Sequence, residues 1–150
     1  MSTAVRPGRL SGRNALITGA SRGIGRAIAL RYAEEGADLF LTASGSAALD
    51  ETRALAEALG AQVYTRTADV SDRAAVQVMV DAALSAFGGI DVLVNNAGVY
   101  KAARLVDTTP EDFDRIMQVN VYGAFHVMQL LLRHMQAHGR GKVVNIASTA

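Results

Sequence analysis

The chain has 150 residues, half of them hydrophobic, and this size predicts a single domain with a sizeable core. Fifteen Lys and Arg residues nearly balance fourteen Asp and Glu residues, so nothing favours nucleic acid or an anionic membrane as a partner. Cysteine is absent from the sequence, which excludes disulfides and thiolate chemistry and fits a cytoplasmic protein.

The N-terminal segment and the longest apolar stretch both argue against membrane segments. Residues 1–13 are polar and basic and lack the apolar core of a signal peptide, so we expect a flexible lead-in there and a folded domain over 14–150. The longest apolar stretch, 121–132, is shorter than the roughly 20 residues that cross a bilayer.

Short apolar runs alternate with longer helical patterns along the chain. Strands are predicted over 15–17, 39–41, 62–66, 90–94 and 142–147. Helices are predicted over 24–35, 47–59, 72–87 and 110–138. Ser71 is the expected N-cap of the third helix and Thr109, followed by Pro110, that of the fourth.

This alternation of strands and helices indicates repeated βαβ units with right-handed crossovers. The strands are nearly continuous apolar runs, as in parallel sheets that are covered on both faces. We therefore expect an α/β fold, a Rossmann-type doubly wound parallel sheet with strand order 3-2-1-4-5, truncated after strand five.

The segment 18–25 reads Thr-Gly-Ala-Ser-Arg-Gly-Ile-Gly and joins the first predicted strand to the first helix. A diphosphate needs backbone N–H groups pointing at it and no Cβ atom in the way. Gly19 permits a sharp turn, Gly23 lets backbone approach the phosphates, and Gly25 lets helix and strand pack closely. No Gly-Lys-Ser/Thr follows, which excludes a P-loop, and a tight turn without ligand is the alternative for this motif alone.

Four further motifs follow this turn in the chain. They are Asp69-Val70 after the third strand, Asn95-Asn96-Ala97-Gly98 after the fourth, Asn120 in the long helix and Ser148 at the end of the fifth strand. With the glycine turn, these motifs resemble the short-chain dehydrogenase/reductase family, specifically its 3-oxoacyl carrier-protein reductase-like members. The resemblance runs from about residue 10 to residue 148.

The resemblance implies an NAD(P)-dependent oxidoreductase that transfers a hydride between nicotinamide and a carbonyl or alcohol substrate. It implies that the Ser148 hydroxyl hydrogen-bonds the substrate carbonyl and that Asn120 holds a water connected to the catalytic lysine. It also favours a homo-oligomer, a dimer or tetramer, for the full-length form. Together with the residue chemistry, it assigns the cofactor contacts to Gly19, Ser21, Arg22, Gly23, Ile24, Gly25, Thr42, Ser44, Asp69, Val70, Asn96, Ala97 and Gly98.

The second predicted strand favours NADP(H) over NAD(H). NAD sites usually place an acid at the carboxyl end of this strand to hold the ribose 2′-OH. Here the strand ends in Thr42 and Ser44 without an acid, and Asp38 lies at its start. Arg22 is a charged donor for a 2′-phosphate, and Thr42 and Ser44 add hydroxyl donors. NAD(H) stays the alternative.

Each motif also has a plainer alternative. Asn95 and Asn96 fit a simple chain turn, Asp69 fits a position just before a helix cap, and Asn120 fits a solvated helix face. Ser148 fits a strand-end cap, and its Ala-Ser-Thr-Ala context excludes a G-x-S-x-G nucleophile elbow.

Two histidines are further candidates, as metal ligands. His134 and His138 have helical spacing, but no third ligand is evident, so a solvated helix end is favoured and no metal site is expected. A methyltransferase is disfavoured, because the Asn95–Gly98 motif has no place in it and no acid follows the second strand.

The family's Tyr-x-x-x-Lys pair is expected on a helix after strand five, and the chain ends at Ala150 before such a helix. None of Tyr32, Tyr64, Tyr100 and Tyr122 has a lysine four residues later. The simplest interpretation is an incomplete reductase sequence. A short form that binds nucleotide without turnover and a ligand-free scaffold are the alternatives.

Overall fold

The computed structural model describes residues 8–148 of the chain. Residues 1–7 of the predicted lead-in lie outside the described part. Residues 8–13 form turns, in which the Leu10 N–H donates to the Glu35 carbonyl at 2.9 Å. The Leu10 side chain packs against the core, so this segment is docked on the end of the first helix.

The strands and helices follow the predicted order, with shifted ends. The strands are β1 (Asn14–Thr18), β2 (Asp38–Ala43), β3 (Val63–Thr67), β4 (Val92–Asn95) and β5 (Lys142–Asn145). The α-helices are α1 (Gly23–Glu34), α2 (Ala47–Ala58), α3 (Arg73–Phe87), α4 (Pro110–Met117) and α5 (Ala124–Ala137). Two short segments complete the set, the 3-10 turn η1 (Leu105–Asp107) and the π-helical η2 (Gln118–Gly123).

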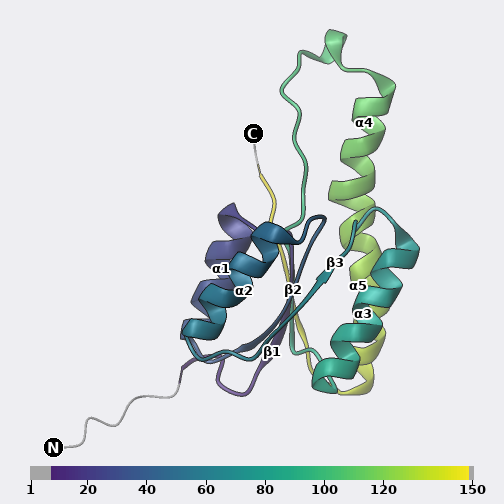
Figure 1. Ribbon diagram of the computed structural model, residues 1–150. Coiled ribbons are helices and arrows are strands. Elements are labelled where there is room, and N and C mark those ends of the chain that lie inside the picture. Colours follow the sequence, from purple (N-terminus) through teal and green to yellow (C-terminus); the bar gives the residue numbers. More distant parts are fainter. Residues whose placement is uncertain (1–7, 149–150) are drawn as a thin grey trace, which may run out of the picture.

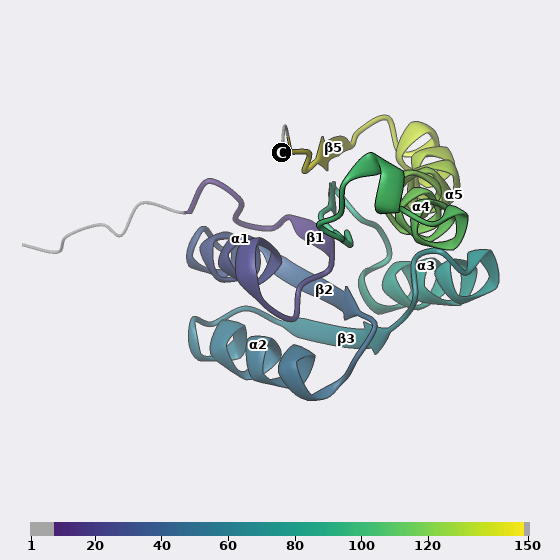
Figure 2. The same ribbon diagram turned by 90° about the horizontal axis from the view of Figure 1, so that it is seen from above.

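The sheet is parallel and has the order β3-β2-β1-β4-β5, which confirms the predicted topology. Ile17 at the centre pairs with Leu41 of β2 on one side and Val94 of β4 on the other. Helices α1 and α2 cover one face, and α3 and α5 cover the other (Figures 1 and 2). This arrangement is a Rossmann-type fold, with three layers.

Alternate residues of the central strands fill the two cores. Ala15 and Ile17 of β1 point into the cluster under α1 and α2, and Leu16 between them points into the cluster under α3 and α5. Leu39 and Phe40 of β2 divide in the same way. Each central strand therefore buries both of its faces, which is why it reads as an unbroken apolar run.

Two local expectations were wrong. Ser71 does not cap α3: the Asp72 side chain accepts from the N–H groups of Ala74 and Ala75, and Ser71 bonds to Asp69 instead. The predicted helix over 110–138 is also not uniform, because η2 inserts a π-helical segment between α4 and α5. The predicted cap at Thr109 is confirmed, since its hydroxyl accepts from the Asp112 N–H at 3.2 Å.

The edges of the sheet and the helix lengths complete the picture. β3 and β5 lie at the two edges, and the side chains of β5 are largely exposed, as expected for the last strand of this chain. Within residues 8–148, no helix combines the length and apolar character needed to cross a bilayer.

Candidate functional site

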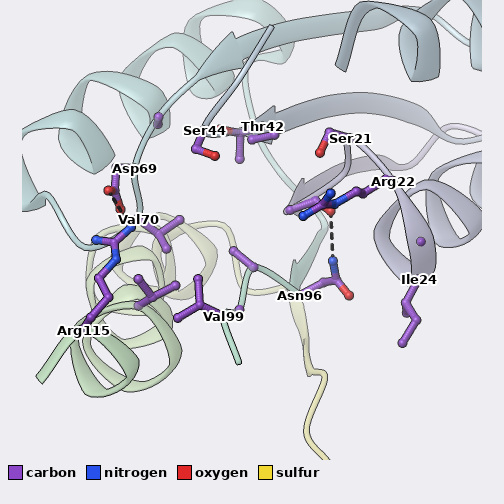
Figure 3. A pocket seen from close by; sticks show the side chains of 17 residues that line it. Ser21, Arg22, Ile24, Thr42, Ser44, Asp69, Val70, Asn96, Val99 and Arg115 are labelled. Atoms are coloured by element: carbon purple, nitrogen blue, oxygen red, sulfur yellow. Dashed lines mark hydrogen bonds and ion pairs between the residues drawn. The ribbon is translucent and has the colours of Figure 1, made fainter. Parts of the chain in front are cut away.

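A cleft of about 390 Å³ opens at the carboxyl ends of the parallel strands. Crevices of this kind bind ligands in open α/β sheets. The glycine turn forms one wall with Ser21, Arg22 and Ile24, and Asp69 and Arg115 stand on the opposite side (Figure 3). The cleft therefore joins segments that lie up to about a hundred residues apart in the chain.

The N-terminus of α1 presents unused backbone donors to this cleft. Gly23 begins the helix with a φ of 54°, in the left-handed region that favours glycine. Among the described residues, none accepts a hydrogen bond from the N–H groups of Gly23 or Ile24, and both residues line the cleft. The first amides of a helix lack partners within it, and together with the helix dipole they attract an anion.

Tight contacts fix the glycine turn against the segment that follows β4. The Thr18 hydroxyl accepts from the N–H groups of Asn96 and Ala97, at 3.1 and 3.0 Å. The Asn96 side-chain amide donates to the Thr18 carbonyl at 3.2 Å and to the Gly19 carbonyl at 3.1 Å, and Figure 3 marks the second of these bonds. Asn96 therefore does more than turn the chain, since it joins the ends of β1 and β4.

Two glycines allow this close approach. A Cβ at Gly19 would lie 2.8 Å from the Ala97 Cα, and a Cβ at Gly25 would lie 2.2 Å from the Gly19 carbonyl oxygen. Any larger side chain at either position would force the backbone apart. Gly25 does not line the cleft, so its role in the structure is the close helix packing that the sequence predicted for it.

An ion pair spans the other end of the cleft. Asp69, after β3, accepts from the Ser71 N–H and hydroxyl at 2.9 and 2.6 Å, and from Arg115 of α4 at 3.2 Å. The Ser71 hydroxyl and, more weakly, the Arg115 guanidinium lower the pKa of the Asp69 carboxyl below its ordinary value. Asp69 is thus an ionised acceptor at the cleft wall at neutral pH.

Arg115 is a cleft residue that the sequence analysis missed. Its guanidinium donates to the Ser71 hydroxyl at 3.0 Å and to Asp69, 46 residues away. No local pattern marks it, because an arginine on a helix after a capping threonine reads as a solvated side chain. Ala43, Ala68, Val99 and Val119 also line the cleft and were not predicted.

The end of β2 bears on the choice of nucleotide. Thr42 lies at the wall of the cleft, but its side chain is fully buried, and its hydroxyl has no hydrogen-bond partner in the described part of the chain. Ser44 follows it at the cleft rim. Asp38 lies at the opposite end of the strand, where its carboxylate accepts from the Gln62 N–H at 2.9 Å. Ser44 therefore supplies an exposed hydroxyl at this end of β2, the predicted Thr42 hydroxyl is buried, and Asp38 takes no part.

Charge in the cleft favours an anion. Its lining in the described residues includes two guanidinium groups, of Arg22 and Arg115, and one carboxylate, that of Asp69. Arg115 is paired with Asp69, whereas Arg22 is exposed and forms no ion pair with any residue within 8–148. The unpaired cation therefore stands beside the unused amides of α1.

A second cavity of about 300 Å³ lies between the ends of β4 and β5 and the η2 segment. Asn120 lines it, and its side chain pairs with both backbone polar groups of Val99. The buried Asn95 side-chain amide donates to the Asn145 side chain at 2.8 Å, while its Oδ1 lacks a partner among the described residues. Ser148 is exposed after β5 and lines neither cavity.

The two histidines considered as metal ligands lie away from the cleft, at the end of α5. The rings of His134 and His138 lie with their centroids 3.9 Å apart and their planes tilted by 33°, and His138 Nδ1 lies 2.8 Å from the His134 carbonyl oxygen. Burial, with the charge of His138, lowers the pKa of His134. Among residues 8–148, no three His, Cys, Asp or Glu side chains gather as a metal-binding group.

Comparison with known proteins identifies the family. The model of the family described as short chain dehydrogenase matches residues 13–150. This chain is a short-chain dehydrogenase/reductase family member. It is 43% identical to sorbitol dehydrogenase from Cereibacter sphaeroides over 143 aligned residues. The alignment covers 95% of this chain and 55% of that protein.

Other members of the short-chain dehydrogenase family give the same result. The chain is 39% identical to the 3-oxoacyl-[acyl-carrier-protein] reductase FabG of Thermotoga maritima, covering 93% of this chain and 57% of the reductase. The crystal structure of NAD⁺-bound xylitol dehydrogenase superposes with a TM-score of 0.92 at 39% identity, over 95% of this chain and 55% of that one. The chain thus spans about half the length of the relatives it matches, and these relatives are dehydrogenases and reductases.

Proposed function

We propose that this chain forms the dinucleotide-binding part of an NADP(H)-dependent short-chain oxidoreductase. The enzyme would transfer a hydride between the nicotinamide and a carbonyl or alcohol substrate. The observation that carries the proposal is the unpaired Arg22 beside the unused N–H groups of α1, at a cleft where the exposed Ser44 hydroxyl follows β2.

Different residues around the cleft fit different parts of a dinucleotide. The N–H groups of Gly23 and Ile24 would hold the diphosphate, which is attracted by the dipole of α1. Arg22 would bind a ribose 2′-phosphate as a charge-assisted donor, with Ser44 beside it. Asp69, ionised and oriented by Ser71, would accept a hydrogen bond from the nucleobase. The nicotinamide supplies or accepts the hydride once the cofactor is bound.

The absence of an acid from the β2 end decides between the two cofactors in this proposal. A carboxylate there would repel a 2′-phosphate, and the described residues that line the cleft place none near Ser44. One similar structure holds the other cofactor: a short chain dehydrogenase from Mycobacterium paratuberculosis, 35% identical with a TM-score of 0.89, is bound to NAD. NADP(H) is thus a property that we propose for this chain from its own residues.

Two residues would act near the substrate. Ser148 would donate a hydrogen bond to the substrate carbonyl. Asn120 uses one donor and one acceptor of its amide on Val99. A carboxamide has two donors and two lone pairs, so one of each is left to hold a water. A short form that binds nucleotide without turnover is the alternative function.

The partners of the full-length form are also proposals. Exposed apolar side chains on α4, η2 and α5 support a homo-oligomer, a dimer or tetramer; they include Phe113, Val121, Tyr122, Phe125 and Leu132. The cysteine-free sequence supports a cytoplasmic location.

Cofactor titration tests the proposal directly. The 150-residue chain would be titrated with NADPH and with NADH, following the nucleotide fluorescence, as wild type and as Arg22→Ala. Arg133→Ala removes another exposed arginine, on α5, and controls for net charge. We expect NADPH to bind more tightly than NADH and Arg22→Ala to weaken NADPH by about tenfold or more, as for a lost charged hydrogen bond. Equal binding of the two nucleotides, unchanged by Arg22→Ala, would refute the assignment.

A further inference from the structure

One carbonyl oxygen of the glycine turn is held from outside the turn. The Ser21 carbonyl accepts from Arg26 Nη2 at 2.8 Å and from Arg26 Nε at 3.2 Å. The hydroxyl of Thr52, on α2, lies 3.2 Å from the same oxygen. Two side chains from two helices therefore converge on a single backbone atom at the edge of the cleft.

The two side chains are themselves held in place. Arg26 Nε also donates to the Thr52 hydroxyl at 2.9 Å, and Arg26 Nη2 forms an ion pair with Glu51 at 2.7 Å. Thr52 is fully buried, and the Arg26 side chain is 24% exposed. The group is therefore a fixed bridge between α1 and α2, which lie side by side on one face of the sheet (Figure 2).

Holding this carbonyl also sets the direction of the next amide. In a planar trans peptide, the C=O and the following N–H point in opposite directions. The described residues contain no cis peptide bond, so the Arg22 N–H points away from Arg26 and Thr52. Within residues 8–148 this N–H has no acceptor, and both Ser21 and Arg22 line the cleft.

We propose that Arg26 and Thr52 are positioning residues for the cofactor phosphates. By holding the Ser21 carbonyl, they fix the Ser21–Arg22 peptide, and with it both the Arg22 amide and the start of the Arg22 side chain. Preorganised donors bind an anion more tightly because no ordering cost is left at the moment of binding. The inference rests on the proposed function and adds that α2, through Thr52, controls affinity at the glycine turn.

A merely structural role for the bridge predicts a different outcome. Loss of a tie between α1 and α2 would lower the melting temperature and leave the affinity of the folded protein unchanged. Loss of positioning would weaken binding, and more for NADPH than for NADH, because the 2′-phosphate contact depends on Arg22. The dissociation constants and the NADPH-to-NADH ratio therefore separate the two roles.

The experiment compares matched variants of the full chain. Thr52→Val removes the hydroxyl at constant shape, and Thr52→Ser retains it. Arg26→Met removes both donors, and Arg53→Met removes an arginine of α2 that is paired with Glu57 and lies outside the cleft lining. We expect NADPH to weaken about tenfold in Arg26→Met and about threefold in Thr52→Val, with Thr52→Ser and Arg53→Met within about twofold of wild type.

Each result has one meaning. NADPH affinity within about twofold of wild type in folded Arg26→Met would overturn the inference. So would a Thr52→Ser variant as impaired as Thr52→Val. If Thr52→Val does not fold, Arg26→Met decides, because its side chain is partly exposed. Wild type that binds neither NADPH nor NADH would instead refute the proposed function itself.

Discussion

The side chain of Asn120 pairs with both backbone polar groups of Val99, 21 residues earlier in the chain. Its carbonyl oxygen accepts from the Val99 N–H at 2.8 Å, and its amide donates to the Val99 carbonyl at 2.9 Å. A Cβ at Gly98 would lie 3.4 Å from the same Asn120 oxygen. The η2 segment is thus joined to the Asn95–Gly98 motif at the edge of both cavities.

This pairing predicts the effect of removing the Asn120 amide. Asn120→Ala should lower the free energy of unfolding by about 1 kcal/mol, because two hydrogen bonds are lost at an exposed site where water replaces them. The neighbouring Gln118→Ala removes an exposed amide that has no partner within residues 8–148, and it should change stability by less than about 0.5 kcal/mol. Urea unfolding measures both, and equal effects would show that the pair contributes nothing.

The start of α3 gives a second prediction. Asp72 caps the helix by accepting from the Ala74 and Ala75 N–H groups, at 2.9 and 3.3 Å. Asp72→Ala should therefore cost about 1 kcal/mol of stability, whereas Asp72→Asn retains a cap and should cost much less. Thermal or urea unfolding distinguishes the two, and a neutral Asp72→Ala would contradict the assigned cap.

Ser71 should act on Asp69 and not on the helix. Its hydroxyl is the largest cause of the lowered Asp69 pKa, ahead of Arg115, so Ser71→Ala should raise that pKa more than Arg115→Ala does. A carboxylate whose pKa is lowered by folding stabilises the fold at pH values above its ordinary pKa. That stabilisation is lost as the pH falls through the folded-state pKa. Carbon-13 NMR titration of the Asp69 carboxyl measures the shifts, and a larger effect of Arg115→Ala would contradict this order.

His134 predicts a pH dependence of stability at the other end of the fold. Burial and the nearby His138 lower its pKa from the ordinary value of 6.5, so the unfolded chain binds the proton more readily. The free energy of unfolding should then fall as pH drops below about 6.5 toward the folded-state pKa, and stay flat above it.

The control for this pH effect is His134→Gln, which removes the group. Asp91, His138 and Arg140 line the same small cavity as His134 and are unchanged in this variant. Urea unfolding at a series of pH values should show a shallower slope for His134→Gln than for wild type. An identical slope in both proteins would mean that another group titrates there.

Periodic patterns predicted the fold well because burial imposes them. The central strands are predictable because their successive residues, such as Leu16 and Ile17, face two different cores, so neither face of the strand takes polar residues. The glycine turn was recognised because Gly19 and Gly25 mark backbone contacts that any Cβ would prevent. In both cases a local sequence feature carries the tertiary constraint.

Features that depend on distant partners were missed or misplaced. Ser71 and Asp72 are adjacent and equally good caps, and only the contact with Asp69 assigns Ser71 elsewhere. The π-helical η2 lies in a continuous helical pattern, and its contact with Val99 was invisible in sequence. Arg115 and Arg26 read as ordinary helix-surface arginines, because their partners come from other elements.

Gly23 provides the most direct test of the central claim, that the N–H groups of α1 bind a dinucleotide phosphate. Its φ is 54°, and a Cβ there meets nothing within 4 Å, so alanine adds backbone strain without a clash. Gly139 is matched, with a φ of 67° and equally open space, but lies at the far end of α5. Alanine should cost each protein a similar 1–2 kcal/mol of stability, roughly.

The measurement is the NADPH dissociation constant of Gly23→Ala and Gly139→Ala, determined on the folded proteins. Gly23 lines the cleft and Gly139 does not, so a methyl group and a strained backbone at Gly23 should weaken NADPH by about tenfold or more, with Gly139→Ala within about twofold of wild type. Equal NADPH affinity in the two variants would contradict the account.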